Sequence, residues 1–148
     1  MNKFWKFAPW LTRLMLLAPT AIFALIASRY LFDPIHAGAV IGLAFNTPMA
    51  ITVARVGFGA FPLACSIFTL SCIVSTPRIL TGLGFVAMIM AVALIVRVSG
   101  MLVDGSVRDN MGLVRAESAM LVVFIIGVFI ERGRRNQIRQ TACVNETP

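Results

Sequence analysis

Charged residues are scarce in this 148-residue chain: they make up 13% of it, against about 25% in ordinary soluble proteins. Hydrophobic residues account for 59%, and the mean hydropathy is +0.89. A soluble globule of this length buries only about 70% of the surface of its unfolded chain, which is too little to hide so much apolar area. The composition therefore excludes a soluble globular enzyme, a disordered protein and a secreted disulfide scaffold. It predicts an integral membrane protein.

Residues that carry metal and redox chemistry are also few. The chain has three cysteines and one histidine, His36. Cys65 and Cys72 are separated by about 10 Å along one predicted helix, too far for a disulfide between them. There is no C-x-x-C pair, phosphate-binding glycine loop, nucleophile elbow or H-E-x-x-H motif. We therefore predict no catalytic residue, no metal site and no cofactor, and an enzyme is the less favoured class of function.

Four long apolar runs dominate the chain. A run of about 20 apolar residues crosses the hydrocarbon core of a bilayer as a helix. The runs predict an all-α, polytopic membrane protein, a four-transmembrane-helix bundle with spans at about 14–32, 56–74, 79–103 and 112–130. No clean small-x-small cleavage site follows the first run, which predicts an uncleaved anchor rather than a signal peptide.

A shorter helix is predicted between the first and second spans. Asp33 followed by Pro34 is a helix start, with aspartate as N-cap and proline at the first helical position. Gly42 is a suitable residue just beyond the helix end. A segment of about nine residues is too short to span the membrane, so we expect it to lie at the interface.

Lysine and arginine are distributed unequally between the connections. Eight of them lie on the side of both chain ends and three on the other. The eight are Lys3, Lys6, Arg13, Arg78, Arg132, Arg134, Arg135 and Arg139, and the three are Arg29, Arg108 and Arg115. Because basic loops stay in the cytoplasm, this predicts a membrane protein with both termini cytoplasmic. Residues 1–13 then form a cytoplasmic arm, 14–132 the membrane domain and 133–148 a basic, disordered tail.

The net charge of +7 does not indicate a nucleic-acid partner. Arg132, Arg134 and Arg135 directly follow the fourth span, where arginine contacts anionic lipid head groups and fixes topology. The predicted partners are therefore membrane lipids, and also other membrane proteins or a second copy of the chain.

Ionisable residues inside the spans are the candidate site. Such groups are costly in lipid and usually face a bundle interior or water. Arg55, Arg97 and Glu117 fall at a similar depth in the predicted outer leaflet, with Asp104 and Arg115 at the border. We expect an internal ion cluster in which Glu117 pairs with one or both arginines. Two alternatives stay open: each arginine reaches the head groups alone, or the residues form a ligand-binding or proton-handling pocket.

Several short motifs together resemble a known family. They are Gly42-Leu43, Asn46-Thr47-Pro48, Arg55-Val56-Gly57-Phe58-Gly59, Arg97-Val98, Asp104-Gly105 and Glu117. This pattern is similar to small bacterial four-helix integral membrane proteins classed as a domain of unknown function, over roughly residues 14–132. The family usually has a glutamate shortly before the helix-two arginine, whereas this chain has Ala50 to Ala54 there. The resemblance implies a bacterial inner-membrane protein whose architecture has no assigned activity. It also makes Arg55 more dependent on Glu117.

Three functions remain open at this point. The first is a non-enzymatic membrane protein that binds a small or lipid-like ligand in a polar pocket of the outer leaflet. The second is a structural or accessory subunit of a larger membrane complex, packed through glycine and alanine faces. The third is a quinone-linked redox subunit, suggested by fold-level analogy with four-helix proteins of the DoxX type. It ranks last because the sequence offers no set of cofactor ligands.

Overall fold

The structure, a computed structural model, describes residues 3–145, and these form helices joined by short turns, without a strand. The elements are α1 (Lys3–Phe32), α2 (Pro34–Val40), α3 (Pro48–Ala54), η1 (Arg55–Ala60), α4 (Phe61–Val74), η2 (Thr76–Arg78), α5 (Ile79–Asp104) and α6 (Val107–Asn145). Four stretches are long and apolar enough to cross a membrane: Pro9–Phe32, Pro48–Val74, Thr76–Asp104 and Asn110–Ile138. The predicted all-α four-helix class is confirmed, and the chain is a multi-pass membrane protein.

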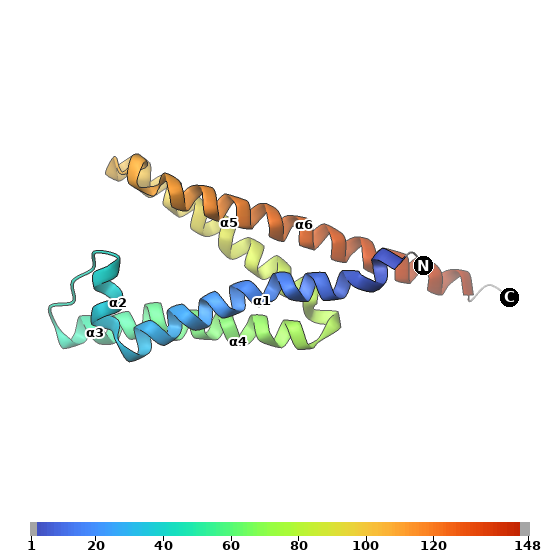
Figure 1. The fold of residues 1–148 in the computed structure, drawn as a ribbon, viewed down its shortest axis with the longest axis horizontal. Helices are drawn as coiled ribbons and strands as arrows, with labels where there is room; N and C mark the ends of the chain where they lie inside the picture. Colours follow the sequence, from blue (N-terminus) through green and yellow to red (C-terminus); the bar gives the residue numbers. More distant parts are fainter. Residues whose placement is uncertain (1–2, 146–148) are drawn as a thin grey trace.

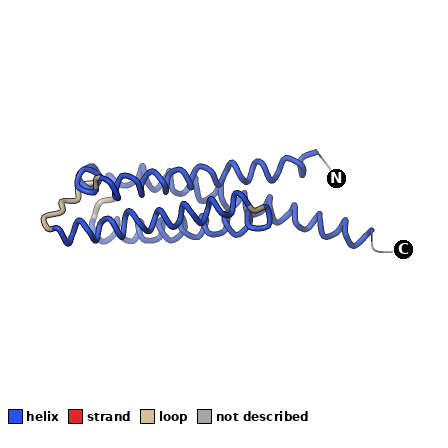
Figure 2. Tube along the Cα trace, turned by 90° about the horizontal axis from the view of Figure 1, so that it is seen from below, coloured by secondary structure: helices blue, strands red, loops and turns tan. Residues whose placement is uncertain are grey.

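The four spans pack as two hairpins of consecutive spans. α1 packs most extensively on α4, and α5 packs most extensively on α6. The hairpins meet near η2 and diverge toward α2 and α3 (Figure 1). The long helices run along one common axis, and α1 and α6 extend past the turn that holds η2 (Figure 2). We refer to the end that holds η2, where α1 begins and α6 ends, as the closed end, and to the end that holds α2 as the open end.

The buried core lies toward the closed end and receives residues from all four spans. Its members are Leu16, Cys72, Ile79, Leu83, Val86 and Phe124. Gly82 makes this packing possible: a Cβ there would lie 2.7 Å from Cys72 Cβ and 3.1 Å from Leu16 Cδ1. Small residues allow such close approach between membrane helices, where dispersion contacts replace the hydrophobic effect as the main attraction.

A polar seam joins α1 to α4 within the membrane. The hydroxyl oxygens of Thr20 and Thr69 lie 2.8 Å apart, and Ser66 Oγ donates to the Thr20 carbonyl at 3.0 Å. All three residues are buried. Hydroxyl groups in lipid need such partners, because no water is available to them. The seam therefore fixes the register of the first hairpin.

The second span contains a π-helical segment, η1, that the sequence did not predict. Phe61 N–H donates to the Val56 carbonyl, five residues back, in place of the usual four. Pro62 explains the wide turn, since proline has no N–H and its ring collides with the carbonyl four residues before it. Gly59 faces α1 here, and a Cβ on it would come within 2.9 Å of Leu31 Cδ2.

The connection between the first two spans agrees with the predicted short helix. Asp33 caps α2 by accepting from the His36 backbone N–H at 3.2 Å, and Pro34 opens the helix. Gly42 has a φ of +78°, the left-handed conformation that favours glycine beyond a helix end.

The predicted disordered tail is wrong for residues 133–145, because α6 continues as a helix to Asn145. Arg134 and Arg135 follow Glu131 by three and four residues, and both pair with it along the helix. Pairs at this spacing stabilise the turn that contains them. Residues 146–148 of the predicted tail lie outside the described residues. The helix also begins at Lys3, within the predicted cytoplasmic arm.

Candidate functional site

Arg97 of α5 and Glu117 of α6 form a bidentate ion pair. Arg97 Nε donates to Glu117 Oε2 at 2.8 Å, and Arg97 Nη2 donates to Oε1 at 2.6 Å. The two side chains retain 30% and 19% of their surface, so the pair is partly shielded rather than sealed. A planar guanidinium suits this geometry because its parallel N–H groups match the two carboxylate oxygens. The pair links the two helices of the second hairpin near the open end.

Asn110 extends the pair toward the turn between α5 and α6. Its Oδ1 lies 3.4 Å from Arg97 Nη1, and its Nδ2 donates to the Ser106 carbonyl at 3.2 Å. The guanidinium has five N–H groups. Two bind Glu117 and a third makes the long contact to Asn110, so further donor capacity remains on Arg97.

An apolar groove of about 620 Å³ lies between α4 and α5, beside this ion pair. Its lining is Phe61, Met88, Ile89, Val92, Ala93, Val96 and Arg97. Arg97 is the charged member of this set. The groove therefore combines an extended apolar wall with one cationic group, Arg97, whose charge is balanced by Glu117, a residue outside the lining.

Arg55 does not join this pair. It is exposed at the start of η1, on the first hairpin, and within the described residues it forms an ion pair with neither Glu117 nor Asp33. It lines a separate pocket of about 380 Å³ between α2 and α3. The hairpins diverge at this end (Figure 1), so equal depth in the membrane does not bring Arg55 to Glu117. The predicted three-member cluster is a two-member pair in the structure.

The two border residues also lie outside the pair. Asp104 is the exposed last residue of α5, and Arg115 is exposed on α6. Neither forms an ion pair with a described residue. Cys65 and Cys72 are free and buried, as expected for small apolar packing, and the Cys143 side chain is outside what the structure describes.

A second ion cluster, at the closed end, involves a residue that sequence reasoning passed over. Glu131 is fully buried and holds two arginines of its own helix. Arg134 contributes Nε at 2.9 Å and Nη2 at 2.5 Å, and Arg135 contributes Nε at 3.3 Å. Arg135 Nη2 also donates to the Pro77 carbonyl at 2.6 Å, which ties α6 to η2. The sequence predicts that Arg132, Arg134 and Arg135 contact lipid head groups. Among these three, only Arg132 is exposed and forms no ion pair with a described residue.

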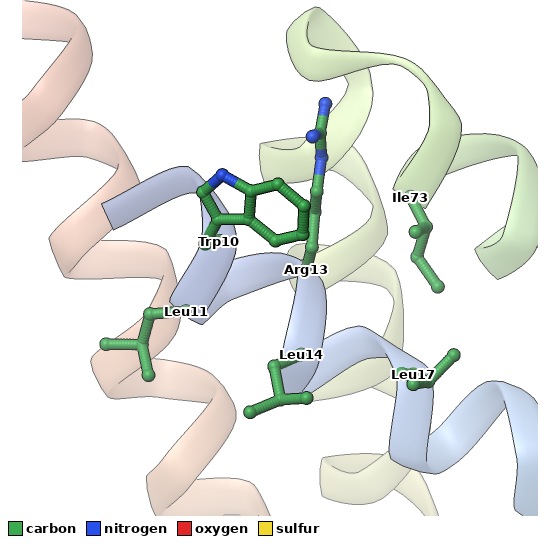
Figure 3. Close-up of a pocket in the computed structure, with 6 residues that line it drawn as sticks. All are labelled: Trp10, Leu11, Arg13, Leu14, Leu17 and Ile73. Atoms are coloured by element: carbon green, nitrogen blue, oxygen red, sulfur yellow. The ribbon is translucent and has the colours of Figure 1, made fainter. Parts of the chain in front are cut away.

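Arg13 of α1 approaches the same turn from the other side. Its Nη2 donates to Thr76 Oγ1 at 2.8 Å, and its guanidinium lies 6.0 Å from the centre of the Trp10 ring. Figure 3 shows the guanidinium extending past the ring, away from Leu14 and toward η2. A second apolar groove, of about 560 Å³, runs below it. Its lining is Trp10, Leu11, Arg13, Leu14, Leu17 and Ile73.

The spacing of Glu131, Arg134 and Arg135 is a signal that could have revealed this cluster. Acidic and basic residues three and four apart lie on one helix face. The groove residues of α1 carry a weaker signal, since an apolar stripe there is equally typical of packing against lipid. Among the described residues, no three of His, Cys, Asp and Glu are grouped so that they could hold a metal ion.

Comparison with known proteins adds no relative. No protein-family model, curated protein or solved structure gives a significant match to this chain. The resemblance to a four-helix family of unknown function therefore stays a prediction, and the function is argued from the geometry of the sites.

Proposed function

We propose that this membrane protein is a non-enzymatic binder of a lipid-like ligand, held in the groove between α4 and α5. The observation that carries this proposal is the placement of Arg97, a paired arginine, in an otherwise apolar lining. Ligand sites are typically apolar cavities with a few well-placed polar groups that set orientation. An apolar chain would lie along the groove, and its polar head would face Arg97.

The balanced charge of the Arg97–Glu117 pair favours a ligand with a neutral head group. Glu117 already balances the charge of Arg97, so an anionic head would lie close to a carboxylate. The remaining guanidinium N–H groups can donate to a carbonyl or hydroxyl oxygen without disturbing that pair. Esters, ketones and quinones attached to long apolar chains belong to this class. A redox role for such a quinone is a separate hypothesis that this binding geometry does not require.

Copurification tests the proposal. We expect the wild-type protein, extracted in a mild detergent, to retain about one neutral carbonyl-bearing amphiphile per chain in native mass spectrometry. Ala93→Phe places a ring in the groove and should remove that ligand, because the added volume occupies the space of its chain. Ile95→Phe is the matched control, since Ile95 is exposed on the same helix and does not line the groove.

Two outcomes would contradict this function. A wild-type protein without any bound amphiphile would exclude retention of a ligand, and equal ligand content in both phenylalanine variants would place the ligand elsewhere. Comigration with a large complex would instead support the accessory-subunit function. The low burial of α6 favours this second candidate, because α6 is the least buried of the four spans within the described structure and so leaves the most surface for another protein.

We also infer that the protein lies in a bacterial inner membrane with the closed end in the cytoplasm. The excess of lysine and arginine in the segments at that end supports the orientation, and the resemblance to small bacterial four-helix proteins supports the membrane. A reporter that is active only in the periplasm should be silent when fused after Pro148. Strong reporter activity, with a cytoplasmic reporter silent at the same position, would contradict the orientation.

A further inference from the structure

We propose that the closed end carries a second, different site, which binds an anionic phospholipid. Its phosphate would lie at the Arg13 guanidinium, and one acyl chain would occupy the groove below it. The site belongs to the first hairpin and η2, at the opposite end of the molecule from the proposed α4–α5 ligand groove.

The first support is an unsatisfied donor on Arg13. Its Nε is buried, and no described residue accepts a hydrogen bond from it. A buried polar atom without a partner is costly, and most such atoms in native proteins have one. Thr76 occupies only Nη2 of the same guanidinium. A phosphate has several acceptor oxygens and pairs with a guanidinium through charge-assisted hydrogen bonds.

The second support is the apolar groove directly below this guanidinium. Trp10, Leu14 and Leu17 are spaced at helical intervals on one face of α1, and Ile73 of α4 closes the opposite side (Figure 3). The groove would hold an acyl chain with its charged head at Arg13. Tryptophan favours the depth of the lipid head groups, and Trp10 lies at the rim with its ring beside Arg13.

Charge complementarity selects an anionic lipid over a neutral one. Among the side chains that the structure describes, the closed end has five basic ones and one acidic one, Glu131, whereas the open end has five basic and three acidic ones. Glu131 is directed to Arg134 and Arg135, so it does not neutralise Arg13. A second hollow of about 340 Å³ is lined by Thr76, the residue that Arg13 binds, together with Pro77, Arg134, Arg135 and Ile138. A head group at Arg13 would therefore lie at an end of the molecule whose described side chains carry a net positive charge.

The groove offers a local optical probe, because the chain has two tryptophans, Trp5 and Trp10. In a Trp5→Phe background, Trp10 is the sole tryptophan. Bromine atoms on an acyl chain should quench its fluorescence when that chain enters the groove. The probe is phosphatidylglycerol with brominated chains, titrated into the full-length protein in phosphatidylcholine–detergent micelles. Brominated phosphatidylcholine is the matched neutral probe.

We expect brominated phosphatidylglycerol to quench Trp10 at concentrations about fivefold lower than brominated phosphatidylcholine, since a basic residue near the surface favours an anionic lipid by about that factor. Arg13→Gln should remove this preference. Arg132→Gln should keep it, because Arg132 is exposed at the same end but lines neither hollow. Glycerol phosphate, which carries the head group without a chain, should fail to reverse the quenching at millimolar concentration.

Equal quenching by the two brominated lipids in the Trp5→Phe protein that keeps Arg13 would overturn the proposal without any Arg13 variant. So would a preference that survives Arg13→Gln, or reversal by glycerol phosphate, which would indicate a phosphate site independent of the groove. Loss of the preference in Arg132→Gln as well would assign it to the general charge of this end, and would also overturn a specific site at Arg13.

Discussion

Replacing Glu131 with leucine is expected to lower the free energy of unfolding by about 3 kcal/mol, the low end of the cost of breaking a buried ion pair. The carboxylate is fully buried and pairs with Arg134 and Arg135. Without it, two guanidinium groups lose their counter-charge, and the one that ties α6 to the Pro77 carbonyl loses its support. Denaturation by SDS in mixed micelles measures the change.

Arg132→Ala is the control for this experiment. Arg132 follows Glu131 directly but is exposed, and a surface substitution of this kind changes stability by about 0.5 kcal/mol or less. If Glu131→Leu were as mild as Arg132→Ala, the buried carboxylate would not hold the closed end together.

The ion pair at the open end is expected to show coupling in a double-mutant cycle. Arg97→Leu and Glu117→Leu should each destabilise the protein, and the double variant should lose about 1 kcal/mol less than the sum of the two. The expected coupling is modest because both side chains keep part of their surface and because polar contacts between membrane helices are typically weak. Thermal unfolding in detergent, compared at one protein concentration, provides the measurement.

The same cycle with Arg55 is the matched control. Arg55 is an arginine of similar depth, but it lies on the first hairpin and forms no ion pair with Glu117 in the described structure. Its effects should therefore add to those of Glu117→Leu within about 0.5 kcal/mol. Additivity for Arg97, or clear coupling for Arg55, would contradict the observed arrangement.

Arg55 shows where prediction from the sequence ends. Counting residues along each span gives depth in the membrane, and on that basis Arg55, Arg97 and Glu117 were expected to meet. Depth gives the position of a residue along the membrane normal only, and says nothing of its position within the membrane plane. The lateral position of a span depends on which helices pack together, and the pairing of α1 with α4 and of α5 with α6 separates the two arginines. Arg97 and Glu117 are on consecutive spans joined by a short turn, so for them depth was sufficient.

The sequence predicts correctly those features that depend only on residues a few positions apart. The aspartate and proline that open α2, and the glycine beyond its end, depend on nearby backbone groups alone. The π-helical turn at η1 depends partly on a local residue, Pro62. It also depends on the close approach of Gly59 to Leu31, which is a tertiary contact between two helices. For the tail, the polar composition predicts a disordered segment in solvent. The ion pairs of Glu131 with Arg134 and Arg135 instead favour continuation of the α6 helix.

The arrangement of the spans as two consecutive hairpins also bears on the order of assembly during synthesis. The partners of the first hairpin, including the Thr20, Ser66 and Thr69 seam, lie within residues 3–74. They are all present in the nascent chain before α6 leaves the ribosome. The bond from Arg135 to the Pro77 carbonyl needs the chain through residue 135 and becomes available later. A nascent chain truncated before residue 131 can therefore build the first hairpin yet lacks the contact that fastens the end of α6 to η2.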